Sequence, residues 1–221
     1  MTFSEWITYV FDHPVSEPLQ EWYWDSAWED WDGPAETIVD YVTRTFNQSG
    51  TLLSPFSDGQ VNQGLNYLIN FSCSSYMVAL QGEVVSLEDR LRCIDSMATL
   101  FKDCFATRCT PYLSHLDEPG VSPLNSVCYM WWDTLPLHGL AHHHPEWPSG
   151  PTVDQHILAV IEQGLNLSEA CVESSLLGLG EWGHYYPEKI QQIIDDFIEA
   201  NPGLRPELRN FALWMRARSE K

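Results

Sequence analysis

The feature that most constrains the fold is the helical spacing of apolar residues through 86–105, SLEDRLRCIDSMATLFKDCF. These residues form one continuous apolar stripe on a helix: Leu87, Leu91, Ile94, Met97, Phe101 and Phe105 (or Cys104). Ser86 and Asp89 have the spacing of a capping box, which is typical of a helix start. No segment of the chain alternates apolar and polar residues with the period of two that indicates a strand. The sequence therefore predicts an all-α fold.

Several other segments show the same periodicity. Helices are predicted over residues 3–11, 35–46, 123–133 and from 152 onward. Asp58 is expected to cap another helix, and Thr152 with Gln155 has the spacing of a second capping box. We therefore expect about ten helices, joined by short turns rich in Pro and Gly and packed as helical hairpins.

Residues 168–218 contain three helical stretches with tight turns between them. Their apolar residues include Leu177 and Leu179, then Ile193, Ile194 and Phe197, then those of NPGLRPELRNFA. In these residues the segment resembles the hairpins of HEAT-type repeats, which implies a curved solenoid that binds proteins. We predict one all-α domain over 1–221, HEAT-like or an irregular α-solenoid or bundle, with an acidic aromatic part at 1–50 and a HEAT-like part at 152–221.

Net charge restricts the possible partners. The chain has 31 acidic and 11 basic residues, a formal net charge of −20. Phosphate backbones and anionic membrane surfaces would be repelled, so neither nucleic acid nor a membrane is an expected partner. A strongly negative field favours the approach of basic proteins. Residues 1–60 hold eleven of the acidic residues and only one basic residue, Arg44, so this part is the expected docking region.

The first residues, MTFSEWITYVFDHP, lack the basic start and long apolar run of a signal peptide. No apolar run is long enough to span a bilayer. The six cysteines are scattered and without CxxC spacing, which is typical of buried free thiols in a reducing compartment. We therefore expect a cytoplasmic protein.

One short segment combines aromatic and acidic residues most densely: 21–32, EWYWDSAWEDWD. Trp24, Trp28 and Trp31 fall at i, i+4 and i+7, so a helix would place them on one face, packed against the core. Trp22 lies off that stripe and is the expected exposed anchor. The carboxylates would face outward. The predicted partner-binding residues are Trp22, Asp25, Trp28, Glu29, Asp30 and Asp32.

A second candidate region is the loop 134–151, TLPLHGLAHHHPEWPSGP. Its histidines, together with His156, could bind a transition metal through imidazole nitrogens. No metal site is predicted, and the residues that would be the candidate ligands are His142, His143 and His144, with His138 nearby. Adjacent histidines do not easily turn to one ion, and no HExxH spacing supports them, so a solvated loop is the other interpretation. No cofactor is predicted.

Motifs for nucleophilic catalysis and for phosphate binding are absent: there is no GxSxG and no glycine-rich loop followed by lysine. We therefore favour a non-enzymatic acidic module that binds a basic protein, most concretely an immunity or antitoxin-like inhibitor. One alternative is a metal-dependent enzyme that uses the histidine-rich 138–156 loop. The other is a structural scaffold subunit in a larger helical assembly.

Overall fold

The computed structural model describes residues 1–17, 20–25 and 30–219, and this part of the chain contains helices and no strands. The all-α prediction is confirmed. The elements in chain order are α1 (Phe3–Phe11), η1 (Trp22–Trp24), α2 (Ala35–Asn47), α3 (Ser49–Leu52), α4 (Asp58–Ile69), η2 (Tyr76–Leu80), α5 (Leu87–Leu100), η3 (Phe101–Phe105), α6 (Ala106–Arg108), η4 (Ser114–Leu116), α7 (Pro123–Thr134), α8 (Leu140–His143), α9 (Gly150–Gly164), α10 (Glu169–Trp182), α11 (Pro187–Ala200) and α12 (Pro206–Arg218).

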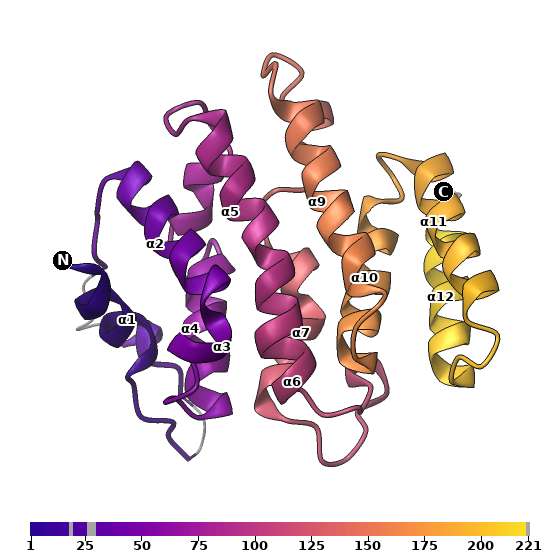
Figure 1. Cartoon of the computed structure of the whole chain (residues 1–221), viewed down its shortest axis with the longest axis horizontal. Helices are drawn as coiled ribbons and strands as arrows, with labels where there is room; N and C mark the ends of the chain where they lie inside the picture. The colour runs from indigo at the N-terminus through magenta and orange to yellow at the C-terminus, as the bar shows by residue number, and fades with distance from the viewer. Residues whose placement is uncertain (18–19, 26–29, 220–221) are drawn as a thin grey trace.

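The longer helices form two layers (Figure 1). In one layer α2 packs against α5 and α5 packs against α9, and these three helices run side by side in the same direction. In the other layer α4 packs against α7 and α7 packs against α10. The pair α11 and α12 closes the C-terminal end against α10. This packing is consistent with an α-helical bundle or an α-solenoid, and the resemblance to HEAT repeats stays a prediction.

A single hydrophobic cluster runs through the stack, from Trp6 on α1 to Met215 on α12. Helix α10 lies at its centre and is buried on nearly every side. Gly178 is what lets α10 approach α7 so closely, because a Cβ atom there would lie 2.7 Å from Cγ of Trp132. A helix that is buried all round needs small residues at such crossings.

Helix starts follow local side-chain chemistry, with two corrections. Ser86 accepts a hydrogen bond from the Asp89 amide, as predicted. Ser57, and not Asp58, caps α4, because its hydroxyl and the Gln60 side chain form a capping box. Thr152 does not cap α9. That helix begins at Gly150, and Pro151 occupies its first turn, where no amide hydrogen is needed.

The predicted 86–105 helix forms, but it ends as a wider turn. Residues Phe101–Phe105 are π-helical and continue into the short α6. Here Phe101 stacks on Trp132 with ring centroids 5.3 Å apart. Leu87 at the start of the stripe is exposed, and the fully buried part begins at Cys93 and Ile94.

Two further predictions concern the cysteines and the membrane. All six cysteines are free thiols, and all but Cys109 are buried. Within the described residues, none of the helices has the length and apolar character needed to cross a bilayer.

Candidate binding surface

The acidic aromatic segment does not form the predicted helix. Trp22–Trp24 make a single 3-10 turn, and Asp25 after it has extended backbone (φ −69°, ψ 126°). The chain is again non-helical from Asp30 to Pro34. Trp28 and Glu29 lie outside the described residues. The helix prediction is therefore wrong for the described part of the segment, where contacts with distant helices decide the backbone path.

Those contacts come from three tyrosines of other elements. The Tyr67 hydroxyl on α4 donates to Asp30 Oδ1 at 2.8 Å. The Trp31 amide donates to the Tyr9 hydroxyl at 2.9 Å, and the Tyr76 hydroxyl donates to the Trp31 carbonyl at 3.1 Å. Tyr9 and Tyr67 are themselves joined at 3.1 Å. Side-chain and backbone groups of Asp30 and Trp31 are thus held by α1, α4 and η2.

Burial affects the pKa of two tyrosines in this network. It is the largest cause that raises the pKa of Tyr67 and of Tyr76 above the ordinary value of 10.0. Both phenols therefore stay protonated and available as donors at neutral pH. Because Tyr67 gives its one proton to the Asp30 carboxylate, Tyr9 must donate to Tyr67. The result is a continuous chain of hydrogen bonds from the Trp31 amide to Asp30.

The tryptophans of the segment differ from the predicted arrangement. Trp24 is the exposed one, with 55% of its surface accessible. Trp22 is half-buried and stacks on His13, with ring centroids 4.0 Å apart. Trp31 is half-buried and stacks on Tyr41 of α2 at 6.0 Å. The predicted roles of Trp22 and Trp24 are therefore reversed, because a 3-10 turn aims their side chains differently from an α-helix.

The carboxylates of the segment do face outward. Asp25, Asp30 and Asp32 are all exposed residues, although one oxygen of Asp30 is used by Tyr67. The chain then passes directly into α2, whose first turn carries the exposed Glu36. The acidic surface therefore continues from the segment onto α2.

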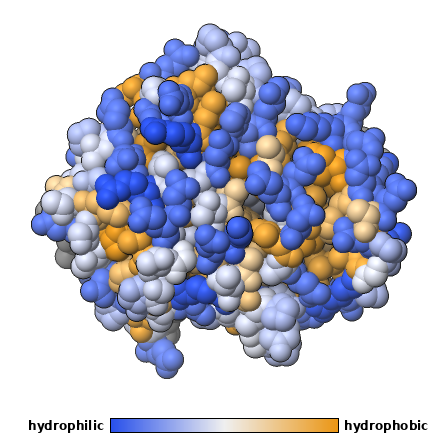
Figure 2. All heavy atoms as spheres, viewed as in Figure 1, coloured by the Kyte–Doolittle hydropathy of each residue, from blue (hydrophilic) through white to orange (hydrophobic). Residues whose placement is uncertain are grey.

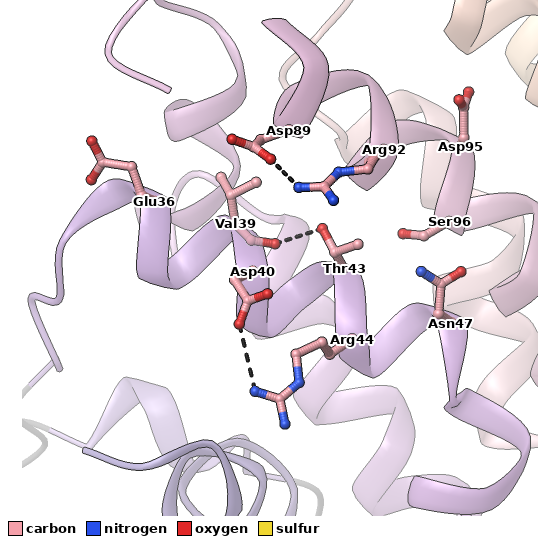
Figure 3. Close-up of a pocket in the computed structure, with 10 residues that line it drawn as sticks. All are labelled: Glu36, Val39, Asp40, Thr43, Arg44, Asn47, Asp89, Arg92, Asp95 and Ser96. Carbon is pink, nitrogen blue, oxygen red and sulfur yellow. Dashed lines mark hydrogen bonds and ion pairs between the residues drawn. The ribbon is translucent and has the colours of Figure 1, made fainter. Parts of the chain in front are cut away.

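A groove between α2 and α5 extends this surface (Figure 3). Its volume is about 540 Å³. The lining residues come from both helices: Glu36, Val39, Asp40, Thr43, Arg44, Asn47, Asp89, Arg92, Asp95 and Ser96. Four carboxylates and two guanidinium groups thus line the groove. Asp40 and Asp89 point toward the arginines, while Glu36 and Asp95 point away from them. On the face of the molecule seen in Figure 2, hydrophilic side chains alternate with hydrophobic patches, the broadest of which lies on the right of the view.

Both arginines of the groove already have partners. Arg44 lies 3.5 Å from Asp40, and its guanidinium carbon lies 3.8 Å above the ring of Phe3. Arg92 is paired with Asp89, and a hydrogen bond from Ser86 together with Arg92 lowers the pKa of that carboxyl. The positive charges that would compete with an entering cationic side chain are therefore those of Arg44 and Arg92, and both are held in place by carboxylates of the groove.

Asp95 has a different neighbour. It is bonded to Nδ1 of His156 on α9 at 2.7 Å. The predicted metal candidate His156 therefore belongs to the α5–α9 contact and not to the histidine-rich loop.

The other histidines of the loop contact different partners. His143 bonds the Tyr185 hydroxyl through Nε2 at 2.7 Å, while His144 bonds Glu146 at 3.2 Å and stacks on Trp147 at 3.9 Å. His142 contacts the rings of Tyr185 and Tyr186 instead. Over the described chain, no group of three or more His, Cys, Asp or Glu side chains has a geometry that could hold a metal ion.

Sequence reasoning missed the α2–α5 groove. The helical spacing of Glu36 with Asp40, and of Asp89 with Arg92 and Ser96, could have indicated one polar face on each helix. That the two faces adjoin depends on the packing of α2 against α5, which no local pattern specifies. Comparisons with models of protein families, with curated proteins and with solved structures give no match. The function of the chain is therefore inferred from its own contacts and charges.

Proposed function

We propose that this chain is a non-enzymatic module that binds a positively charged protein through its acidic N-terminal part. In this proposal it acts as an immunity or antitoxin-like inhibitor acts on a cationic toxin. The observation that carries it is the groove between α2 and α5, which is lined by four carboxylates and by two arginines that Asp40 and Asp89 already hold. Such a surface attracts lysine and arginine side chains at long range and can orient them at short range.

The aromatic residues support the same proposal. Trp24 is exposed next to Asp25, and a tryptophan at the centre of an interface can contribute about 2–4 kcal/mol to binding. Asp30 is held in position by Tyr67 before any partner arrives. A surface that is already ordered loses less conformational entropy on binding.

The proposal also includes the cellular compartment in which the protein acts. Six free thiols without a disulfide among them suit a reducing environment. We infer that the protein acts in the cytoplasm, where such an inhibitor would meet its partner before that partner causes damage.

Affinity capture with quantified salt dependence tests the proposal. The wild-type chain is compared with the variant Asp32→Asn/Glu36→Gln/Asp40→Asn, which removes three charges from the acidic surface. The matched control is Glu188→Gln/Glu199→Gln/Glu162→Gln, which removes three exposed charges from α9 and α11. Captured proteins are identified by mass spectrometry at about 50 mM and about 300 mM salt, a range over which exposed charges are increasingly screened.

We expect a captured partner with net positive charge whose recovery falls with salt and with the first variant, but not with the control. Removal of Trp24 by Trp24→Ala should weaken that partner further. A partner that binds equally well in high salt, or equally well to the triple variant of the acidic surface, would contradict the proposal.

A further inference from the structure

Arg90, the fourth residue of α5, is a buried cation without a carboxylate partner. Only 2% of its surface is accessible. Nη2 donates to the Ser149 hydroxyl at 3.1 Å, Nη1 lies 3.5 Å from the Leu80 carbonyl, and Nε has no acceptor. In the described part of the chain, Arg90 forms no ion pair. This is unusual in a protein with almost three acidic residues for every basic one.

A buried guanidinium without a counter-ion is unfavourable, because the protein interior replaces little of the hydration that the charge loses. Burial accordingly lowers the pKa of Arg90, and the only opposing influence is the field of Glu83. Arginine does not solve this problem by losing its proton. An anion from outside the chain would solve it.

The surroundings of Arg90 are suited to an anion. Arg90 lines a recess of about 320 Å³ together with Ser86, Ser149 and Thr152. Ser86 occupies the N-cap position of α5 and Ser149 that of α9, so the starts of two long helices meet there. These helices run side by side in the same direction (Figure 1). The start of α9 contributes a partial positive charge at the recess, whereas that of α5 is offset by Glu88 and Asp89 in its first turn.

The start of α9 differs from the usual arrangement in two respects. Its first turn contains no acidic residue. The Ser149 side chain makes no capping bond to the helix backbone and instead accepts the bond from Arg90. The positive end of this helix is therefore not neutralised by its own side chains.

We propose that this recess, the Arg90 recess, binds the oxyanion of a small ligand, either a carboxylate or a phosphate group. Arg90 supplies the charge and the uncommitted Nε–H group. The hydroxyls of Ser149 and Thr152 supply further polar contacts around it, while the hydroxyl of Ser86 already donates to Asp89. Glu83 lines the same recess, so a singly charged oxyanion fits better than a multiply charged one. This site is separate from the α2–α5 groove, and its test does not depend on the protein partner.

Calorimetric titration of the full chain with acetate, with inorganic phosphate and with chloride tests the proposal at constant ionic strength. We expect saturable one-site binding of acetate, phosphate or both, and none of chloride. Arg90→Met should weaken binding by roughly 10- to 100-fold, the loss expected for a charge-assisted hydrogen-bonding group. Arg92→Met is the matched control: this arginine lies two residues along on α5, is exposed and pairs with Asp89. It should change the affinity by less than about twofold.

A second variant keeps the test decisive if Arg90→Met does not fold. Thr152→Glu places a carboxylate of the chain itself at the recess, in the first turn of α9 where it suits the helix dipole. It should abolish oxyanion binding while the helix content measured by circular dichroism stays unchanged. The proposal is overturned if the wild type binds neither oxyanion, if chloride binds equally well, if Arg92→Met weakens binding as much as Arg90→Met, or if folded Thr152→Glu binds like the wild type.

Discussion

Tyr67 on α4 donates a 2.8 Å hydrogen bond to Asp30, a residue 37 positions earlier in the chain. The bond ends a chain of hydrogen bonds that starts at the Trp31 amide and passes through Tyr9. It connects the acidic segment to the hydrophobic core at a point where the segment has no regular secondary structure. The direction in which the exposed carboxylates point is therefore decided by a residue of α4.

Replacing Tyr67 by phenylalanine should loosen the segment without disturbing α4. The change removes the hydroxyl that donates to Asp30 and that Tyr9 contacts. The phenylalanine ring still fills the buried site. We expect the free energy of unfolding to fall by about 1.5–3 kcal/mol, the usual contribution of a hydrogen bond to a charged group. Denaturant titration measures this loss, and hydrogen exchange at the Trp31 amide should become faster.

Tyr112→Phe is the control, because Tyr112 is a partly exposed tyrosine in another loop. Its stability should change by less than about 0.5 kcal/mol. Equal effects of the two substitutions would show that the bond to Asp30 does not hold the segment.

The same relationship shows where sequence patterns were sufficient and where they were not. The helices from 168 onward were predictable from local signals: α11 and α12 begin with Pro187 and Pro206, and Pro202 and Gly203 follow the end of α11. The tryptophans of 21–32 have equally good helical spacing, yet Trp22–Trp24 form only one 3-10 turn. Five acidic residues disfavour a helix there, and the tyrosines offer the backbone other hydrogen bonds.

The sites depend even more on long-range packing. Glu36 and Asp95 line one groove only because α2 and α5 are neighbours in a layer. Arg90 reaches Ser149 across 59 residues. Local patterns identified the acidic N-terminal part as a whole, because charge is a property of composition, but they could not identify which side chains share a recess.

Glu173 on α10 provides a test of a carboxylate that, unlike Asp30, is buried. It is fully buried and accepts hydrogen bonds from the amides of Ser114 and His115, at 3.0 and 2.9 Å, and from His115 Nδ1 at 2.5 Å. Glu173→Ala should lower the free energy of unfolding by about 3–5 kcal/mol, because it leaves these donors without an acceptor. Glu162→Ala, an exposed position on α9, should cost less than about 0.5 kcal/mol in the same denaturant titration. A small loss for Glu173→Ala would mean that water replaces the carboxylate.

Stability should depend on pH through His138. Burial is the largest cause that lowers the pKa of His138 below its ordinary value of 6.5, and its Nε2 atom is buried without a hydrogen-bond partner. The unfolded chain therefore binds this proton at a higher pH than the folded chain. The stability that results is fully present above pH 6.5 and is lost as the pH falls through the lower pKa of the folded state.

His138→Gln should therefore make the fall in unfolding free energy below pH 6.5 less steep than in the wild type. Denaturant titrations at a series of pH values measure the slope. His184→Gln is the control, because His184 is exposed and contacts the ring of Tyr185. If the slope is the same in His138→Gln as in the wild type, His138 is not the group responsible.

Arg90 leads to the last prediction, in which the sign of a stability change depends on the buffer. In chloride alone, Arg90→Met should raise the free energy of unfolding by about 1–2 kcal/mol, because methionine fills the buried site without the desolvation cost of an unpaired charge. In a buffer containing an oxyanion that occupies the Arg90 recess, the wild type gains binding energy that the variant cannot gain, so the advantage should shrink or reverse. Thermal and denaturant unfolding of both proteins in matched chloride, acetate and phosphate buffers measures this crossover. If Arg90→Met were less stable than the wild type by the same amount in all three buffers, the bonds to Ser149 and Leu80 would be sufficient partners for the guanidinium, and Arg90 would be an ordinary structural residue.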